Sequence, residues 1–169
     1  MSTRFQFITK QKDNDNFISM SIFWNSISKK NGLDEQKKLS PFTEQLDLFY
    51  ICLLIGLKNN LKINTDVFEK SDVNDAWTKN LKTSGAKDYI LGLFLSKITN
   101  EFKDDQSKIK KTINEVLDND SETNLSDFGM EKINSYCFAG YIKILEELKN
   151  NTPSTIVKFL NVVDKLLRN

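Results

Sequence analysis

The carboxylates that could take part in acid–base chemistry occur in adjacent pairs. Asp104 is followed by Asp105, and Glu146 by Glu147. Successive residues of a helix point about 100° apart, so neither pair converges on one substrate. We expect helix capping from the first pair and solvent exposure for the second. The tripeptide Glu-Gln-Lys at 35–37 matches a fragment of metal-dependent nuclease motifs, but such motifs place it on a strand beside a second acid.

The chain of 169 residues contains no histidine, the side chain that titrates near neutral pH and most often binds transition metals. Histidine-dependent hydrolases, HExxH zinc sites and histidine-activated nucleases are therefore excluded for this chain alone. Its six glycines are scattered singly, without a phosphate-binding loop. Cys52 and Cys137 lie in apolar or aromatic segments, where cysteine usually acts as a small buried hydrophobe. We expect a protein that is not an enzyme and has no cofactor or metal site.

Nucleic-acid binding would depend on a lysine-rich stretch, because basic and acidic residues nearly cancel at 24 against 23. Only two arginines occur, so specific reading of bases is not expected. A lysine face could still contact a phosphate backbone nonspecifically, although surface lysines usually only solvate a helix. The candidate residues are Lys103, Lys108, Lys110 and Lys111.

Residues 40–61 contain the only long apolar run, in which the ten residues from Leu48 to Leu57 carry no charge. A helix that is apolar on every side is normally surrounded by protein or lipid. This run is shorter than the roughly 20 residues that a membrane span needs. Ser40 is suited to the N-cap and Pro41 to the first helical position. We therefore predict a central helix at about 41–58, buried on nearly every side, and no membrane contact.

Helical spacing of apolar residues predicts further helices at 16–30, 73–81, 86–102, 104–118, 126–149 and 154–168. Residues 1–15 alternate only briefly and are expected to form an extended arm, and 61–71 an irregular link. Gly92 within a predicted helix suggests close approach of a neighbouring helix, which could be the one that contains Gly56. The prediction is an all-α single domain, 1–169, with six or seven helices around the central one.

Two late segments contain more apolar surface than one core contact needs. Aromatic side chains in 136–141 go almost all the way round a helix, so they either fill both sides of a buried helix or form an interface. In the last helix we assign Ile156, Leu160, Val163 and Leu167 to the core, and the other edge needs a second neighbour from this chain or a partner. The predicted partner-binding residues are Tyr136, Phe138, Tyr141, Phe159, Val162 and Leu166.

Three segments together resemble small helical accessory proteins that are encoded beside bacterial DNA-phosphorothioation (Dnd) systems. They are PFTEQLDLFYICLLIGLKNN at 41–60, AKDYILGLFLSKI at 86–98 and EKINSYCFAGYIKILEEL at 131–148. In that group an acidic residue precedes an apolar aromatic run ending in glycine, and a late helix combines tyrosine, glycine and Ile-Leu. The matching residues are Asp47, Phe49, Gly56, Tyr136, Gly140, Ile144 and Leu145, whereas Ala139 replaces a glycine of the group.

The resemblance implies a role in defence against phage or foreign DNA. Our leading hypothesis is a non-catalytic accessory subunit that binds a larger ATPase, helicase or nuclease of the same defence operon, with a homo-oligomer also open and DNA contacted only indirectly or nonspecifically. The alternative is a DNA-binding or DNA-processing protein that acts through its lysine-rich helix face. Residues 1–12 lack the apolar core of a signal peptide, so we expect a cytoplasmic protein.

Overall fold

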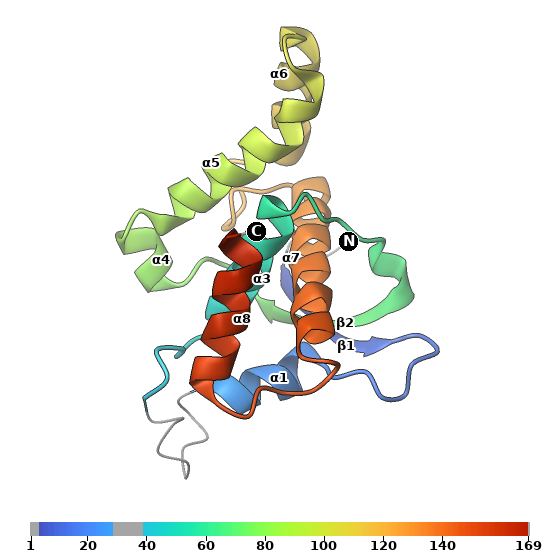
Figure 1. Ribbon diagram of the computed structural model, residues 1–169. Helices are drawn as coiled ribbons and strands as arrows, with labels where there is room; N and C mark the ends of the chain where they lie inside the picture. Colours follow the sequence, from blue (N-terminus) through green and yellow to red (C-terminus); the bar gives the residue numbers. More distant parts are fainter. Residues whose placement is uncertain (1–3, 29–38, 169) are drawn as a thin grey trace.

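The computed structural model describes residues 4–28 and 39–168 (Figure 1). This part of the chain forms seven α-helices, two strands and two short 3-10 helices. In chain order they are β1 (Phe5–Gln11), α1 (Met20–Ile27), α3 (Gln45–Lys58), η2 (Thr65–Val67), β2 (Phe68–Asn74), α4 (Lys79–Thr83), α5 (Ala86–Thr99), η3 (Asn100–Phe102), α6 (Gln106–Val116), α7 (Asp127–Glu147) and α8 (Ile156–Arg168).

The all-α prediction is wrong, because β1 and β2 form a two-stranded antiparallel sheet in which Phe7 pairs with Ser71. Strand β1 comes from the segment expected to be an arm, and its Phe5, Phe7 and Ile8 side chains are fully buried. Strand β2 gave no sequence signal, since most of its residues are polar and exposed. Its conformation depends on pairing with a strand more than fifty residues away.

The free edge of β1 is paired with a side chain of α7. Asn134 is buried, and its Oδ1 accepts a hydrogen bond from the Gln6 amide at 3.3 Å. Its Nδ2 donates to the Arg4 carbonyl at 3.2 Å. One asparagine thus satisfies a backbone donor and a backbone acceptor, as a neighbouring strand would, and attaches the sheet to the helical core.

Helices α3 and α7 form the centre of the molecule and cross in close contact (Figure 1). The crossing requires glycines: a Cβ on Gly56 would lie 2.0 Å from the Tyr136 carbonyl oxygen, and one on Gly140 would lie 1.8 Å from that of Cys52. Gly92 was the wrong partner for Gly56, since a Cβ there would meet nothing within 4 Å. The glycines of the central crossing come from α3 and α7.

Several helix boundaries differ from the predictions. Helix α1 begins after the N-cap Ser19, and its predicted end near residue 30 lies outside the described residues. Helix α3 begins four residues after Pro41, because the Asp47 carboxylate accepts the amide hydrogens of residues 43 and 44 in a capping box. The helix predicted at 73–81 is wrong. Its first residues end β2, and Trp77 precedes α4 with its indole N–H donating to the Thr123 carbonyl at 2.8 Å.

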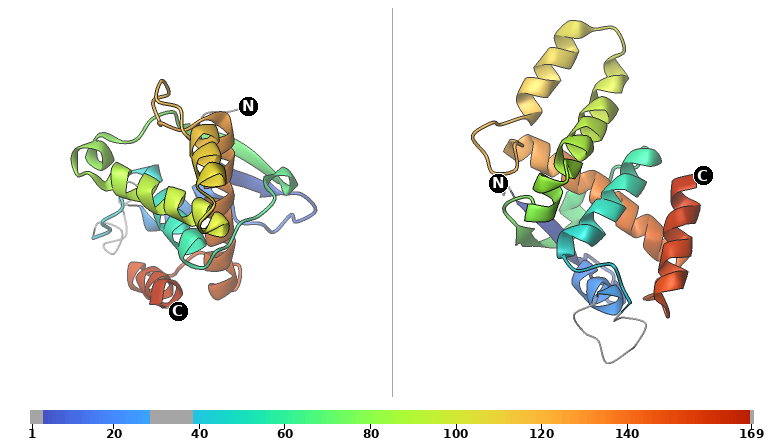
Figure 2. Two further views of the ribbon diagram at one scale, coloured as in Figure 1. Left: turned by 90° about the horizontal axis from the view of Figure 1, so that it is seen from above. Right: turned by 90° about the vertical axis from the view of Figure 1, so that its left-hand side faces the viewer.

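Helices α5 and α6 form a hairpin that projects from one end of the molecule, whereas α8 packs beside α3 (Figures 1 and 2). The observed α5, α6, α7 and α8 agree with the predicted segments to within a few residues, and α7 and α6 begin after the predicted capping residues Ser126 and Asp105. Within the described ranges, every helix is too short or too polar to cross a membrane.

Candidate functional site

An apolar groove of about 320 Å³ lies between α3, α5 and α8. Leu54 and Leu57 of α3, Leu93 of α5 and Leu167 of α8 supply its apolar lining. The remaining lining residues are Lys58, Ser96, Lys97 and Asn100. Figure 2 shows α3 between the other two helices in the view on the right, so its outward face forms the floor between two helical walls.

The groove exists because residues 4–28 and 39–168 cover only part of the apolar helix α3. Helix α7 covers the side of α3 that contains Cys52 and Gly56, both fully buried. On the opposite side Tyr50, Ile51 and Leu54 are only half-buried. The prediction that residues 48–57 are buried on nearly every side is therefore wrong for these three. An apolar helix face without a covering layer is what a binding surface needs.

Beyond one end of the groove's lining, two tyrosines lie one turn before Leu54 and Leu93. Tyr89 of α5 is 62% exposed, and Tyr50 of α3 is close enough to interact with it electrostatically. Burial raises the pKa of the Tyr50 phenol above its ordinary value, and Tyr89 raises it further. The Tyr50 phenol is therefore neutral near pH 7. Tyrosine combines a large apolar ring with a polar end, which suits it to the edge of an interface.

The opposite end of the groove is basic. Lys58 and Lys97 line it there, in the last turns of α3 and α5. Tyr50 approaches Tyr89 at one end while Lys58 and Lys97 share the other, so α3 and α5 run in the same direction. Helix α8 runs this way too, because the Asn59 side chain donates to the Leu166 carbonyl at 3.1 Å. The C-terminal ends of three helices thus meet at the basic end.

The residues predicted to bind a partner lie elsewhere. Tyr136, Phe138, Tyr141, Phe159 and Leu166 are buried in the protein's own core, and Val162 is half-buried. Five of the six side chains are therefore not exposed to a partner, and of the two alternatives for 136–141 the structure shows the first, in which aromatic side chains fill both sides of a buried helix. The Tyr141 ring meets Phe23 edge-on at 5.5 Å between centroids, and its hydroxyl donates to the Ile18 carbonyl at 2.7 Å.

For the central residues of α8, the buried and exposed faces are the opposite of those predicted. Phe159 faces the core, whereas Leu160 is 41% exposed. Leu160 is seven residues before the groove residue Leu167 and therefore lies on the same side of the helix. Sequence reasoning missed this face and the outward face of α3. The available signal was that α3 is apolar all round, which guarantees apolar surface on any side that the chain leaves uncovered.

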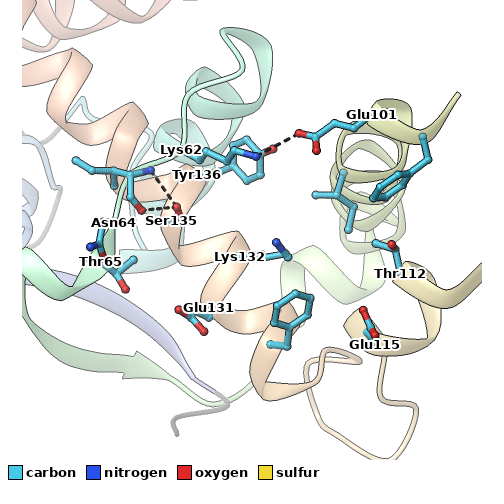
Figure 3. Close-up of a pocket in the computed structure, with 14 residues that line it drawn as sticks. Lys62, Asn64, Thr65, Glu101, Thr112, Glu115, Glu131, Lys132, Ser135 and Tyr136 are labelled. Carbon is cyan, nitrogen blue, oxygen red and sulfur yellow. Dashed lines mark hydrogen bonds and ion pairs between the residues drawn. The ribbon is translucent and has the colours of Figure 1, made fainter. Parts of the chain in front are cut away.

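A second cleft of about 370 Å³, lined by both polar and apolar side chains, lies between the 62–65 segment, the α5–α6 hairpin and the start of α7 (Figure 3). The Lys62 ammonium pairs with the Glu101 carboxylate at 3.2 Å. The Ser135 hydroxyl accepts from the Ile63 amide at 3.0 Å and donates to the Ile63 carbonyl at 2.6 Å. The Lys132 ammonium lies 4.5 Å from the centre of the Phe128 ring. These groups already have partners within the protein.

The Tyr136 side chain borders this cleft. Burial raises the pKa of its phenol, while the Lys62 charge opposes the shift and the Glu101 charge adds to it. The phenol therefore stays protonated at neutral pH and is not suited to act as a base there.

The lysines predicted to contact DNA all lie at the surface of α6 or just before it. Lys108 pairs with Asp105 at 3.2 Å, and Lys111 with Glu115 at 3.8 Å. Lys103 and Lys110 are exposed. Ion pairs inside α6 reduce the charge that this face presents to a phosphate backbone, so the arrangement gives the DNA hypothesis no additional support.

The carboxylate pairs do not form a catalytic constellation. Asp105 is the N-cap of α6, and its side chain accepts from the Lys108 amide at 3.1 Å. Glu146 pairs with Lys143 at 2.9 Å, and Glu147 with Lys165 of α8 at 2.6 Å. The Glu-Gln-Lys tripeptide at 35–37 lies outside the described residues. Among residues 4–28 and 39–168, no group of three or more metal-ligating side chains could hold a metal ion.

Comparison of the chain with protein family models, with curated proteins and with solved structures found no match.

Proposed function

We propose that this protein is a non-catalytic accessory subunit that binds a larger protein through the groove between α3, α5 and α8. The observation that carries the proposal is the outward face of α3, where the described residues leave Tyr50, Ile51 and Leu54 only half-buried. Binding of a partner removes the apolar side chains of the groove from water, and this burial lowers the free energy of the complex by about 25 cal/mol per Å². The side chains are held by rigid helices, so little conformational entropy is lost on binding.

The class of partner comes from the resemblance to Dnd-associated accessory proteins. A larger ATPase, helicase or nuclease of an antiphage operon would supply the chemistry, and this chain would supply a docking surface. Asp47 and Gly56, two of the residues that carry the resemblance, have structural roles in α3: Asp47 caps the helix and Gly56 permits its contact with α7. The shared residues thus support the helix that forms the groove floor.

Co-purification of the tagged protein with each product of its operon tests the proposal. We expect one product to be retained by the wild type and lost with Leu54→Asp, because an unpaired charge in the apolar contact is costly. Ile22→Asp is the matched control: Ile22 is 59% exposed in the first turn of α1, away from the groove. It should keep the partner.

Both variants must first be shown to melt near the wild-type temperature. A folded Leu54→Asp protein that retains its partner would refute the groove as the docking surface. Retention of the purified wild type on a DNA column at low salt, lost on substitution of Lys103 and Lys110 by glutamate, would instead favour the DNA-binding alternative.

A further inference from the structure

We propose, building on the docking function above, that the groove holds one amphipathic helix of the partner, running antiparallel to α3 and with acidic residues in its first turn. The shape of the groove supports a helical occupant. Its lining on α3 runs from Leu54 to Lys58, about one helical turn. The half-buried Tyr50, one turn before Leu54, continues the same side of the helix, so the open side from Tyr50 to Leu57 is about 10 Å long. A helix that presents apolar residues at i, i+3, i+4 and i+7 fills a groove of this kind.

Charge complementarity determines which end of the occupant is acidic. The eight lining residues include Lys58 and Lys97 and no carboxylate, and both lysines lie at the C-terminal end of the groove. A partner side chain that reaches this end while its apolar face fills the groove meets two positive charges. Glutamate or aspartate is favoured at that position and lysine is disfavoured.

The orientation follows from the helix directions. Helices α3, α5 and α8 all place their C-terminal ends at the basic end of the groove, so their partial negative charges gather there. The N-terminal end of an occupant helix has the opposite partial charge. Acidic residues are also most favourable in the first turn of a helix. A helix that runs antiparallel to α3 and has an acidic first turn therefore pairs with the two lysines, opposes the partial charges of the three helix ends and meets its own preference for acidic residues in the first turn.

A second copy of this chain fits the groove less well. The exposed amphipathic helices α6 and α8 have no acidic residue in their first turn. Helix α7 has Asp127 in its first turn, but its apolar side chains are buried in the core. Self-association through the groove is therefore an outcome of the test and not the proposal.

Two stapled helical peptides of about 16 residues provide the test. Both contain leucine at i, i+3, i+4 and i+7, and they differ only in having two glutamates or two lysines in the first turn. Stapling and circular dichroism ensure equal helicity. Binding is measured by fluorescence anisotropy at low salt against wild type, Leu54→Asp, the double variant Lys58→Glu/Lys97→Glu, and the double variant Lys103→Glu/Lys110→Glu, which makes the same change of net charge on α6 and just before it.

We expect the wild type to bind the glutamate peptide about tenfold more tightly than the lysine peptide. Lys58→Glu/Lys97→Glu should reverse this preference, Lys103→Glu/Lys110→Glu should retain it, and Leu54→Asp should bind neither peptide. Paramagnetic labelling of the peptide N-terminus should broaden signals of residues near Lys58, and labelling of its C-terminus those near Tyr89.

The inference is overturned if the wild type binds neither peptide, if it binds both equally, or if the labels give the opposite orientation. Concentration-dependent dimerisation that Leu54→Asp abolishes would also overturn it, by making the groove an interface between two copies. These failures differ from failure of the docking function. If the peptides fail while Leu54→Asp still loses the operon partner, only the occupant is wrong.

Discussion

Gly140 of α7 lies directly against Gly56 of α3, so closely that a Cβ on Gly140 would come within 2.9 Å of the Gly56 amide nitrogen. The same Cβ would lie 1.8 Å from the Cys52 carbonyl oxygen, which is backbone and cannot rotate away. The contact brings the outermost face of α3 to a fixed depth between α5 and α8. The depth of the groove therefore depends on the absence of side chains at Gly56 and Gly140, on the side of α3 that faces away from the groove.

We predict that Gly140→Ala lowers the free energy of unfolding by about 3 kcal/mol, since the added methyl group forces the two helices apart. Urea unfolding followed by circular dichroism measures the change. Gly92→Ala is the control, because a Cβ at this exposed helical position meets nothing within 4 Å. It should stabilise the protein by up to about 1 kcal/mol through helix propensity. Equal stability of Gly140→Ala and wild type would contradict the close crossing.

Asn134→Leu should destabilise the protein by about 2 kcal/mol. The change removes the side-chain partners of the Gln6 amide and the Arg4 carbonyl and leaves these backbone groups unsatisfied beside α7. Hydrogen exchange of the Gln6 amide should also become faster than in the wild type. Asn114→Leu, at an exposed position of α6, is the control and should change stability by less than about 0.5 kcal/mol.

Tyr141→Phe should lower stability near pH 7 by about 1 kcal/mol, because the hydroxyl that donates to the Ile18 carbonyl is lost. Burial raises the pKa of Tyr141 in the folded protein well above its ordinary value of 10.0. The unfolded chain therefore releases this proton first, and stability falls as the pH rises above 10.

Tyr141→Phe has no phenol proton to release, so the difference in unfolding free energy between wild type and this variant should shrink between pH 10 and 11. The change approaches about 1.4 kcal/mol per pH unit once the unfolded-state tyrosine is ionised. Urea unfolding at pH 7, 9, 10 and 11 measures the difference between the two proteins. A constant difference across this range would show that Tyr141 titrates normally in the folded state.

Cys52 and Cys137 should resist thiol reagents in the native protein. Both are fully buried, and burial together with the adjacent Cys52 raises the pKa of the Cys137 thiol, so little of the reactive thiolate exists. We expect Ellman's reagent to modify both thiols in urea, with modification in buffer limited by unfolding. Gly140→Ala should speed the native reaction, because it weakens the packing around Cys52. Rapid modification of the wild type in buffer would refute the buried location.

The sequence by itself was sufficient to predict most of the helices, because helical periodicity and capping are local. The apolar spacing in 126–149, with its Ser126 cap, predicted α7 almost to the residue, and the run at 48–57 identified α3 as the central helix. The absence of histidine excludes histidine-dependent hydrolases from the sequence alone, because that chemistry depends on residue type and not on packing.

Only the tertiary structure decided what depends on residues far apart in the chain. Strand β2 is polar and becomes a strand by pairing with β1, and Gly56 meets Gly140 and not Gly92. The site followed the same rule. An apolar helix face looks identical in sequence whether the chain covers it or not. Periodicity therefore left open whether this chain or a partner covers Phe159, and it assigned Leu54 to the core. Which face remains open is set by where α5, α7 and α8 pack, and their positions are fixed by contacts across the whole fold.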